Sequence, residues 1–301
     1  MKKVYAVIVT YNAMAWIEKC LSSLKNSTIP VVLVVVDNCS KDNTVEYICR
    51  HWPDVKLFEE KKNHGFGQAN NIGIRYALEQ EADYVLLLNQ DAWIDSFMLE
   101  RLLPYDDGKT ILSPVHLNGA GDALDRNFLN SSVKRNGHAS LLFHDPILQK
   151  GKSLCVADEI CAACWLVPRR ILENIGGFNP LFFHYSEDLN YQQRIHYHGF
   201  KMAWLQGTFV CHDREFRPRQ SVRYILVRQE MALRATDINY SVCMNFFRQV
   251  RYAMGAVHCA FRYHEPQTLW YLIKASAFVL WHSAEVKESR IKEKTLGRNW
   301  L

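Results

Sequence analysis

The sequence predicts an α/β fold, an open sheet flanked by helices, followed by a region made of helices alone. Strand and helix patterns alternate over the first 115 of the 301 residues, which is typical of βαβ units and a parallel sheet. The segment Val31–Val36 is almost all valine, as expected for a strand buried on both faces. From Ser221 to about Lys294 the pattern is helical, with no strong strand signal.

The expected strands of the first region are short runs rich in apolar and β-branched residues. They are Val4–Thr10, Val31–Val36, Val55–Phe58 and Asp83–Leu88, with Ile111–Val115 as a candidate fifth. Helical spacing of apolar residues predicts helices between them, at Ala13–Leu24, Asp42–Arg50 and Gly67–Leu78.

The stretch from His116 to Gly151 has weak periodicity and is rich in Asn, Ser, Gly and Asp. This composition predicts an insertion or a mobile loop over the cleft. Further along the chain, a short strand beginning near Thr208 is expected to end at His212.

Composition excludes several classes of protein. Apolar residues make up 49% and charged residues 22%, as in a folded globular protein and unlike a disordered chain. No run reaches the roughly 18 apolar residues that indicate a membrane span. Lys and Arg outnumber Asp and Glu by only 36 − 31 = 5, so we expect no nucleic-acid partner. The nine cysteines are odd in number and no signal peptide follows Met1, so we expect reduced thiols in a cytoplasm.

Polar side chains follow three of the expected strands. Tyr11 and Asn12 follow the first strand, Asp37 and Asn38 the second, and the run Asn89–Asp91 the fourth. In open α/β sheets the ligand crevice lies beyond the carboxyl ends of the strands. These residues are therefore the first candidates for a ligand site, although a carboxylate such as that of Asp42 can equally cap the next helix.

The run Asn63–Gly73 is rich in glycine and asparagine and enters a helix. It differs from a dinucleotide-binding fingerprint because Asn70 stands where the third glycine is required, and no acidic residue ends the following strand. Backbone amides at the start of this helix could still bind a phosphate.

Three further groups have both an ordinary and a functional interpretation. Asn89 and Asp91 have the spacing of two oxygen ligands for Mg²⁺ or Mn²⁺, although this pattern is also common in turns. Glu187 and Asp188 stand at a probable helix start, where acids are electrostatically favoured, and either could act as a general base. His212 is a structural residue or a metal ligand.

The helical C-terminal region is basic and aromatic. Between Arg217 and Arg262 there are eight arginines against two acids, Glu230 and Asp237. Leu269–Trp281 is apolar but too short for a membrane span, and is expected to be a docked or interfacial helix. Two interpretations stay open, peripheral contact with an anionic membrane, or the surface of a helical bundle or homodimer.

Taken in order, these motifs resemble those of the family 2 glycosyltransferases of the GT-A type. The resemblance covers about residues 4–215, and the Asn63–Gly73 run matches a rhamnosyltransferase-like branch of the family. Two positions depart from the family pattern. Asn89 replaces the first acid of the Asp-x-Asp metal motif, and Asn190 replaces an acid two residues after Asp188. The segments that carry the resemblance are Val7–Asn12, Asp37–Asp42, Asn63–Gly73, Leu88–Ala92, Gly176–Phe178, Glu187–Asp188 and His212.

The resemblance implies a role for each candidate residue. Asp188 would be the catalytic base, with Glu187 as its alternative, and Asp91 and His212 would contact a divalent cation, Mg²⁺ or Mn²⁺. The nucleobase would bind Asp37, beside the turn that starts at Thr10. The residues expected to bind the nucleotide-sugar are Thr10, Tyr11, Asn12, Asp37, Asn38, Gly67, Asn71, Asn89 and Gln90.

The resemblance also implies an organisation of the chain. Residues 1–218 would form a GT-A domain with a Rossmann-like, open mixed sheet. Its nucleotide-sugar half would span about 1–115 and its acceptor half about 116–218. Residues 219–301 would be a helical extension.

The expected activity is metal-assisted, inverting transfer of a hexose by single displacement. The donor would be dTDP-rhamnose or a UDP-hexose, and the acceptor a hydroxyl of a glycan or lipid-linked saccharide. Such an enzyme would work in the cytoplasm, either free or at the inner membrane face. The alternatives are a non-catalytic sugar-nucleotide or glycan-binding protein on the same fold, and a nucleotidyltransferase. A nucleotidyltransferase usually has a basic, glycine-rich loop after its first strand. In this sequence Tyr11–Met14 stands at that position instead.

Overall fold

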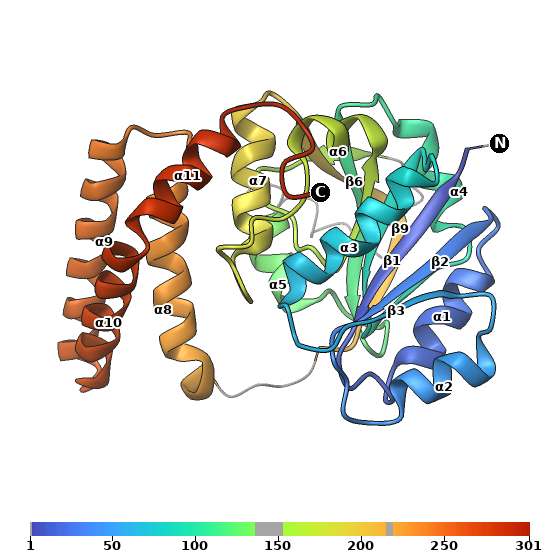
Figure 1. The fold of residues 1–301 in the computed structure, drawn as a ribbon, viewed down its shortest axis with the longest axis horizontal. Helices are drawn as coiled ribbons and strands as arrows, with labels where there is room; N and C mark the ends of the chain where they lie inside the picture. The colour runs from blue at the N-terminus through green and yellow to red at the C-terminus, as the bar shows by residue number, and fades with distance from the viewer. Residues whose placement is uncertain (1, 136–152, 215–218) are drawn as a thin grey trace.

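The computed structural model describes residues 2–135, 153–214 and 219–301. Its centre is a single mixed sheet with the strand order β3-β2-β1-β4-β8-β6-β9-β5, and β7 pairs with β9 beside this path (Figure 1). The strands β3, β2, β1 and β4 are parallel, whereas β8 runs antiparallel to both β4 and β6. The α/β fold with an open mixed sheet is therefore confirmed.

The strands of the parallel half agree closely with the sequence prediction, because the apolar runs of β1 and β4 and the second half of β2 are buried. The bounds in this half are β1 Val4–Thr10, β2 Val31–Asp37, β3 Lys56–Glu59 and β4 Tyr84–Asn89. The other strands are β5 Ala92–Ile94, β6 Thr110–Asn118, β7 Leu154–Val156, β8 Cys164–Pro168 and β9 Lys201–His212.

Helices cover both faces of the sheet. Those of the sheet domain are α1 Ile17–Lys25, α2 Thr44–His51, α3 Phe66–Glu79, α4 Met98–Leu102, α5 Arg126–Phe128, α6 Arg169–Ile175 and α7 Glu187–Tyr197. Two short helical turns follow α4 and α5, a 3₁₀ turn at Leu103–Tyr105 and a π-helical turn at Leu129–Lys134.

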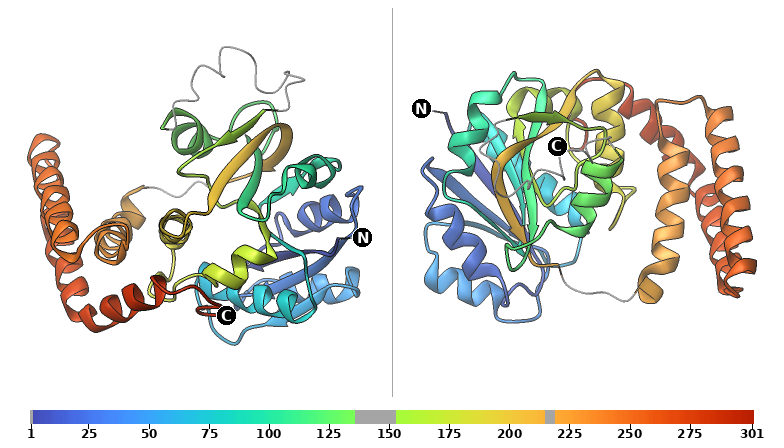
Figure 2. Two further views of the ribbon diagram at one scale, coloured as in Figure 1. Left: turned by 90° about the horizontal axis from the view of Figure 1, so that it is seen from above. Right: turned by 180° about the vertical axis from the view of Figure 1, so that it is seen from behind.

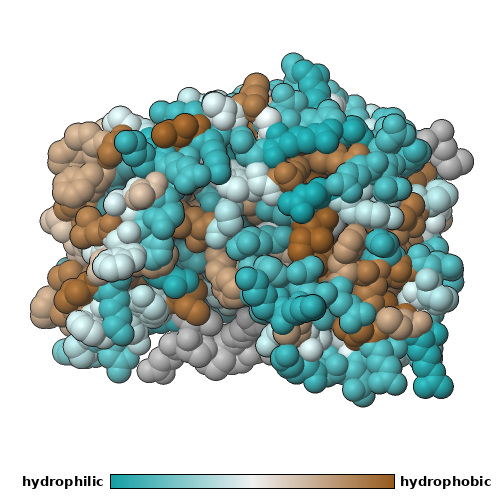
Figure 3. All heavy atoms as spheres, in the orientation of Figure 1, coloured by the Kyte–Doolittle hydropathy of each residue, from teal (hydrophilic) through white to brown (hydrophobic). Residues whose placement is uncertain are grey.

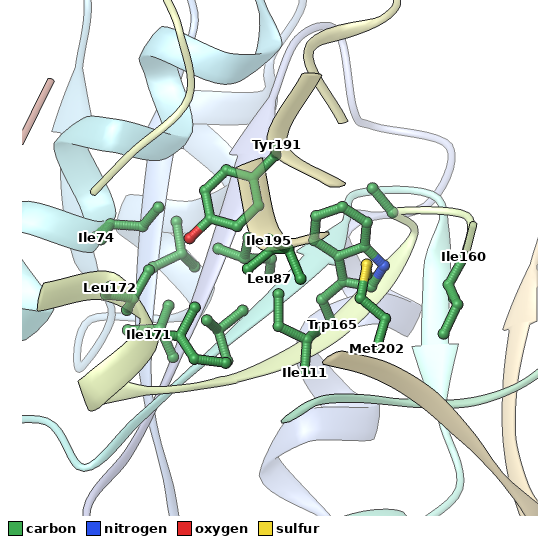
Figure 4. Close-up of a cluster of buried hydrophobic side chains, with 14 of the residues drawn as sticks. Ile74, Leu87, Ile111, Ile160, Trp165, Ile171, Leu172, Tyr191, Ile195 and Met202 are labelled. Carbon is green, nitrogen blue, oxygen red and sulfur yellow. The ribbon is translucent and has the colours of Figure 1, made fainter. Parts of the chain in front are cut away.

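Side chains of α3, α6 and α7 pack on one face of the sheet in a large apolar cluster (Figure 4). Trp165 of β8 and Tyr191 of α7 lie in this cluster and are almost fully buried. The opposite face is covered by a second cluster, in which α1 and α4 contribute residues such as Leu21 and Leu99. The first cluster fixes α7, which carries Glu187 and Asp188, against the sheet.

Two sequence predictions need correction. The first helix begins at Ile17 instead of Ala13, because Ala13 donates its backbone N–H to Thr44 Oγ1 in a turn before the helix. The expected loop at His116–Gly151 is partly ordered secondary structure. Asp125 accepts hydrogen bonds from the N–H groups of Asn127 and Phe128 and so starts α5. Residues 136–151 of this prediction lie outside the described residues.

The C-terminal region is helical, as predicted, and stands beside the sheet domain (Figure 2). Its helices are α8 Arg219–Thr236, α9 Val242–Arg262, α10 Gln267–Trp281 and α11 Ser283–Glu293. After α11 the chain returns to the sheet domain, where the carbonyl of Asn299 accepts a hydrogen bond from Gly177 N–H at 2.8 Å. Among the described residues, no helix is both long enough and apolar enough to cross a membrane.

A buried polar cluster joins α11 to α7. Glu293 Oε1 accepts hydrogen bonds from Asn190 Nδ2 at 2.8 Å and from Asn179 Nδ2 at 2.7 Å. Ser289 Oγ adds a third at 3.1 Å. Asn190 is one of the two departures from the family pattern, and here a carboxylate from a distant helix lies beside it. Burial raises the pKa of Glu293, although Arg194 and these donors oppose the shift.

We predict that Glu293→Ala destabilises the protein by at least about 2 kcal/mol, because each buried amide left without an acceptor costs about 1–3 kcal/mol. Urea denaturation measures this change. The control is Glu288→Ala on the same helix, which removes only an exposed ion pair with Lys292 and should leave the unfolding midpoint unchanged. Equal midpoints for both variants would contradict the assigned role of Glu293.

Candidate active site

The strand order reverses between β1 and β4, and the ends of these strands meet at the predicted ligand crevice. Tyr11 follows β1 and Gln90 follows β4. Tyr11 N–H donates to Gln90 Oε1 at 2.7 Å, and Gln90 Nε2 donates to the Tyr11 carbonyl at 3.2 Å. The two strand ends are therefore tied together at the switch point of the sheet.

Asp37 is held rigidly beneath this surface. Its Oδ1 accepts hydrogen bonds from Thr10 Oγ1 at 2.8 Å and from Ser40 Oγ at 2.5 Å, and its Oδ2 accepts from Ser40 N–H at 2.9 Å. Thr10 is fully buried and Asp37 is 2% exposed. By contrast, Tyr11 and Asn12 are exposed. The surface that a ligand can reach is thus formed by the exposed residues, and the buried ones fix the turn.

Asn12 has a left-handed backbone conformation, with φ of 53°, which asparagine tolerates better than most residues. Its N–H donates to Ser40 Oγ and its Oδ1 accepts from Lys41 N–H at 2.7 Å. The turns after β1 and β2 therefore hold each other in place.

Asn38 joins the turn after β2 to the glycine-rich loop. Its Nδ2 donates to Asn63 Oδ1 and to the Gly65 carbonyl, and its Oδ1 accepts from His64 N–H. Asn38 is 3% exposed, and both ends of its amide are used within the protein. Asn38 therefore positions the glycine-rich loop, and its implied contact with the nucleotide-sugar stays a prediction.

The glycine-rich loop packs the two halves of the sheet domain together. A Cβ on Gly65, whose φ is +81°, would lie 1.8 Å from the carbonyl oxygen of Phe183, and one on Gly67 would lie 2.8 Å from Phe178 Cβ. Phe66 N–H donates to that Phe183 carbonyl, so the start of α3 is occupied by protein. These glycines allow close packing, and the contact of Gly67 with the nucleotide-sugar stays a prediction.

Asn71 has a similar positioning role. Its Nδ2 donates to the Phe178 carbonyl at 2.8 Å, and its Oδ1 accepts from Phe178 N–H at 2.7 Å. The side chain is 5% exposed. Both ends of the amide bind the backbone of a segment 107 residues away. Its contact with the nucleotide-sugar donor stays a prediction.

The predicted cation ligands come together at the ends of β4, β5 and β9. Asp91 Oδ1 lies 3.2 Å from His212 Nε2, and the Asn89 amide nitrogen lies 3.4 Å from the same ring nitrogen. The β5–β9 register, which pairs Ala92 with His212, explains this approach. Asn89 Oδ1 is buried without a hydrogen-bond partner among the described residues.

This donor set fits a divalent cation. The Asp91 carboxylate and the unpartnered Asn89 oxygen are hard oxygen ligands, and the His212 imidazole suits Mn²⁺ better than Mg²⁺. Within the described ranges, no cluster of three or more His, Cys, Asp or Glu side chains is arranged to hold a metal. A cation here would therefore need further ligands from a bound molecule.

Glu187 and Asp188 lie at the start of α7, after two residues with left-handed backbone conformations. These are Tyr185 (φ 68°) and Ser186 (φ 67°), which store strain of a kind often found at functional sites. Burial raises the pKa of Glu187, with Asp188 adding to the shift. Burial also raises the pKa of Asp188, with the charge of Glu159 adding to it and Arg214 opposing it.

The two carboxylates face different surroundings. Glu187 is 6% exposed, lies against Gly67, and its Oε2 has no hydrogen-bond partner in the part of the chain that is described. Asp188 is only half-buried and lines an open cavity of about 530 Å³. A molecule in this cavity can reach Asp188, which makes Asp188 the better-placed proton acceptor of the pair.

Sequence reasoning missed Arg214. Its Nε donates to Asp125 Oδ2 at 2.6 Å, and its Nη2 lies 2.9 Å from Cys161 Sγ. Burial acts to raise the pKa of Asp125, but the hydrogen bond and charge of Arg214 outweigh it and hold that pKa below its usual value. Arg214 also affects Asp188 electrostatically. Its position two residues beyond His212 in the sequence was the available signal.

The sheet topology and the polar strand ends are those of an α/β fold with its ligand site at a switch point. The sequence profile of "Glycosyl transferase family 2" matches residues 5–176 of the chain. This match covers more than half of the 301 residues, so the chain belongs to glycosyl transferase family 2.

Two curated proteins are similar in sequence. The low-salt glycan biosynthesis hexosyltransferase Agl10 of Haloferax volcanii is 28% identical over 185 residues, covering 60% of this chain and 58% of that protein. The O-antigen chain rhamnosyltransferase RfbN of Salmonella typhimurium is 25% identical over 228 residues, covering 72% of this chain and 68% of that protein. The match thus spans little more than half of the length of Agl10.

A solved structure shares the fold. The crystal structure of S. aureus TarS 1–349 superposes with a TM-score of 0.57 at 15% identity, covering 97% of this chain and 89% of that one. Because the superposition covers 97% of this chain, it includes the C-terminal helical region.

Proposed function

We propose that this protein is an inverting glycosyltransferase that moves a sugar from a nucleotide-diphosphate donor to a hydroxyl of a glycan or lipid-linked acceptor. The main observation is the meeting of Asp91 and His212 at the switch point of the sheet. The carboxylate of Asp188, which is half-buried, lines a cavity of about 530 Å³. Residues 1–218 would carry the reaction, and residues 219–301 would form the helical extension.

The donor is either dTDP-rhamnose or a UDP-hexose. Agl10 is named as a hexosyltransferase and RfbN as a rhamnosyltransferase, and TarS 1–349 has also been solved in complex with UDP. Tyr11, Asn12 and Gln90 would contact the nucleotide, because they are accessible at the strand ends. Thr10, Asp37 and Asn38 are buried and would support nucleotide binding indirectly, by holding these turns in place.

Asp188 would accept the proton of the acceptor hydroxyl while its oxygen forms a bond to the anomeric carbon of the donor. The bond from that carbon to the diphosphate breaks in the same displacement, so the anomeric centre is inverted and a nucleoside diphosphate leaves. A divalent cation held by Asp91 and His212, with Asn89 beside them, would supply positive charge for the leaving diphosphate. Arg214 adds a fixed positive charge near Asp188.

We predict that Asp188→Asn lowers the kcat of sugar transfer by about 10²- to 10⁴-fold, the usual contribution of a positioned base. In the wild type, kcat should fall as the pH is lowered through the raised pKa of Asp188, above the usual carboxylate range near 4, because only the ionised form accepts a proton. The measurement is release of free nucleoside diphosphate as a function of pH, with the exposed Asp54→Asn as control.

Full activity of Asp188→Asn together with a large loss in Glu187→Gln would move the base to Glu187. Release of pyrophosphate instead of nucleoside diphosphate would identify a nucleotidyltransferase. Donor binding without any turnover in the wild type would support a non-catalytic binding protein.

We predict that one nucleotide family among UDP-, dTDP- and GDP-sugars raises the melting temperature, and that Mn²⁺ increases this shift. A ligand at 100 times its Kd stabilises by about 2.7 kcal/mol, which is measurable. Asp91→Ala should abolish the effect of Mn²⁺ because it removes the accessible anionic ligand, whereas Asp95→Ala should preserve it. An unchanged Mn²⁺ effect in Asp91→Ala would contradict the proposed cation site.

The outer face of α9 and α10 favours contact with an anionic membrane. Val242, Phe246, Val250 and Met254 recur every four residues along α9 and are all exposed. Trp281, at the end of α10, is 86% exposed. Figure 3 shows apolar side chains along the edge of the molecule formed by these helices. Arg251 and Arg262 of α9 are also exposed, so this helix presents both apolar and basic side chains, which suit an anionic lipid layer.

We predict that the wild type co-sediments with liposomes containing phosphatidylglycerol at low salt. Adding about 0.5 M NaCl should weaken this binding because the salt screens the charges. Trp281→Ser should weaken it further, whereas Phe97→Ser, which changes an exposed aromatic residue on the sheet domain, should not. Absence of liposome binding, with self-association in analytical ultracentrifugation, would instead indicate a homodimer surface.

A further inference from the structure

The cavity beside Asp188 is enclosed from two sides. Asp188 and Gln192 of α7 line one side, and residues of the C-terminal helices line the other. On α8 the lining residues Arg223, Leu226 and Glu230 are spaced three and four apart, so they form one stripe of the helix. Tyr252 of α9 completes this wall. The helical extension therefore supplies part of the surface next to the proposed base.

The wall is fixed relative to α7. Gln229 Nε2 of α8 donates to the His184 carbonyl at 3.0 Å, just before the strained turn that precedes Glu187. Asn239 Nδ2 donates to the Gln193 carbonyl at 3.0 Å. Ala232 and Leu233 of α8 bury their side chains against Phe182 in a small apolar cluster. These contacts hold the wall in place before any ligand binds, which lowers the entropic cost of binding.

Apart from Asp188, the charged side chains that line the cavity are paired within the protein. Both lining arginines have carboxylate partners, Arg135 with Glu159 and Arg223 with Glu265. The lining acid Glu230 is paired with Arg234 at 2.5 Å. Among the described lining residues this leaves no unpaired cation for a phosphate group, so the cavity suits a neutral ligand.

The remaining lining groups suit a neutral sugar. Asn127, Asn130 and Ser131 offer amide and hydroxyl groups to sugar hydroxyls, and the rings of Tyr185 and Tyr252 offer flat apolar surfaces. Gln192 is 3% exposed, and its Nε2 has no hydrogen-bond partner among the described residues, while its Oε1 accepts from Ile160 N–H at 2.8 Å. The volume of about 530 Å³ lies within the usual range for ligand pockets.

We propose that this cavity binds the acceptor as a neutral saccharide, and that Leu226, Glu230 and Tyr252 of the C-terminal helices determine which saccharide is accepted. The inference rests on the glycosyltransferase function proposed above. It assigns the helical extension a direct part in acceptor selection, in addition to its surface for a membrane. Asp188 at the edge of the cavity would meet the hydroxyl of the bound sugar.

The test measures stimulation of nucleoside diphosphate release by a panel of neutral methyl glycosides and the corresponding sugar 1-phosphates. At least one neutral glycoside should stimulate the wild type. Leu226→Trp should raise the KM for that glycoside at least tenfold, with a change of less than twofold in the KM for the donor, because Leu226 is 40% exposed and a larger side chain extends into the cavity. Leu296→Trp, a substitution at an exposed position outside the lining, is the matched control.

Tyr252 provides a second variant. Tyr252→Ala should raise the KM for the glycoside about tenfold, and Tyr252→Phe should largely restore it if the ring surface makes the contact. Wild-type KM values in both Leu226→Trp and Tyr252→Ala would overturn the proposal. So would stimulation by sugar 1-phosphates alone, or none by any glycoside in protein that turns over its donor. Failure of the wild type to bind or hydrolyse any nucleotide-sugar would instead overturn the proposed function itself.

Discussion

The paired hydrogen bonds between the Asn71 side chain and the backbone of Phe178 hold the two halves of the sheet domain in register. Asn71 belongs to α3, beside the parallel strands, and Phe178 precedes the segment that leads to α7. Because the buried amide donates and accepts at once, replacing it would leave two buried backbone groups unpaired. The relative position of the strand-end surface and the α7 carboxylates depends on this contact.

Close packing around Asn71 reinforces the same constraint. Gly65 and Gly67 allow Phe183 and Phe178 to approach the start of α3 more closely than any side chain would permit. Glu293 of α11 accepts hydrogen bonds from Asn179 and from Asn190 of α7. These bonds attach the C-terminal helices to the sheet domain. Helix α7 is thereby fixed from both sides, by the glycine-rich loop and by the helical extension.

The carboxylates of Asp125, Glu187 and Asp188 fall into two groups by their partners, with Asp125 in the first and the α7 pair in the second. Asp125 is paired with Arg214, and its pKa is held below the usual value, so it stays ionised and serves as a fixed structural charge. Among the described residues, Glu187 and Asp188 form no such ion pair, and burial raises the pKa of each. A carboxylate in the second group is more basic than one in water, which suits a group that accepts a proton during the reaction.

The sequence by itself determined the parallel strands, the helical C-terminal region and the polar residues at the strand ends, because apolar periodicity and strand-end position are local properties of the chain. The sequence motifs also indicated Asp91, Asp188 and His212 as candidate site residues. Only the tertiary structure decided that Asn38, Gly67 and Asn71 act within the protein, and that α8 and α9 line the cavity next to Asp188. Those outcomes depend on contacts between residues far apart in the chain, such as the 107 positions that separate Asn71 from Phe178, and no local pattern encodes such a pairing.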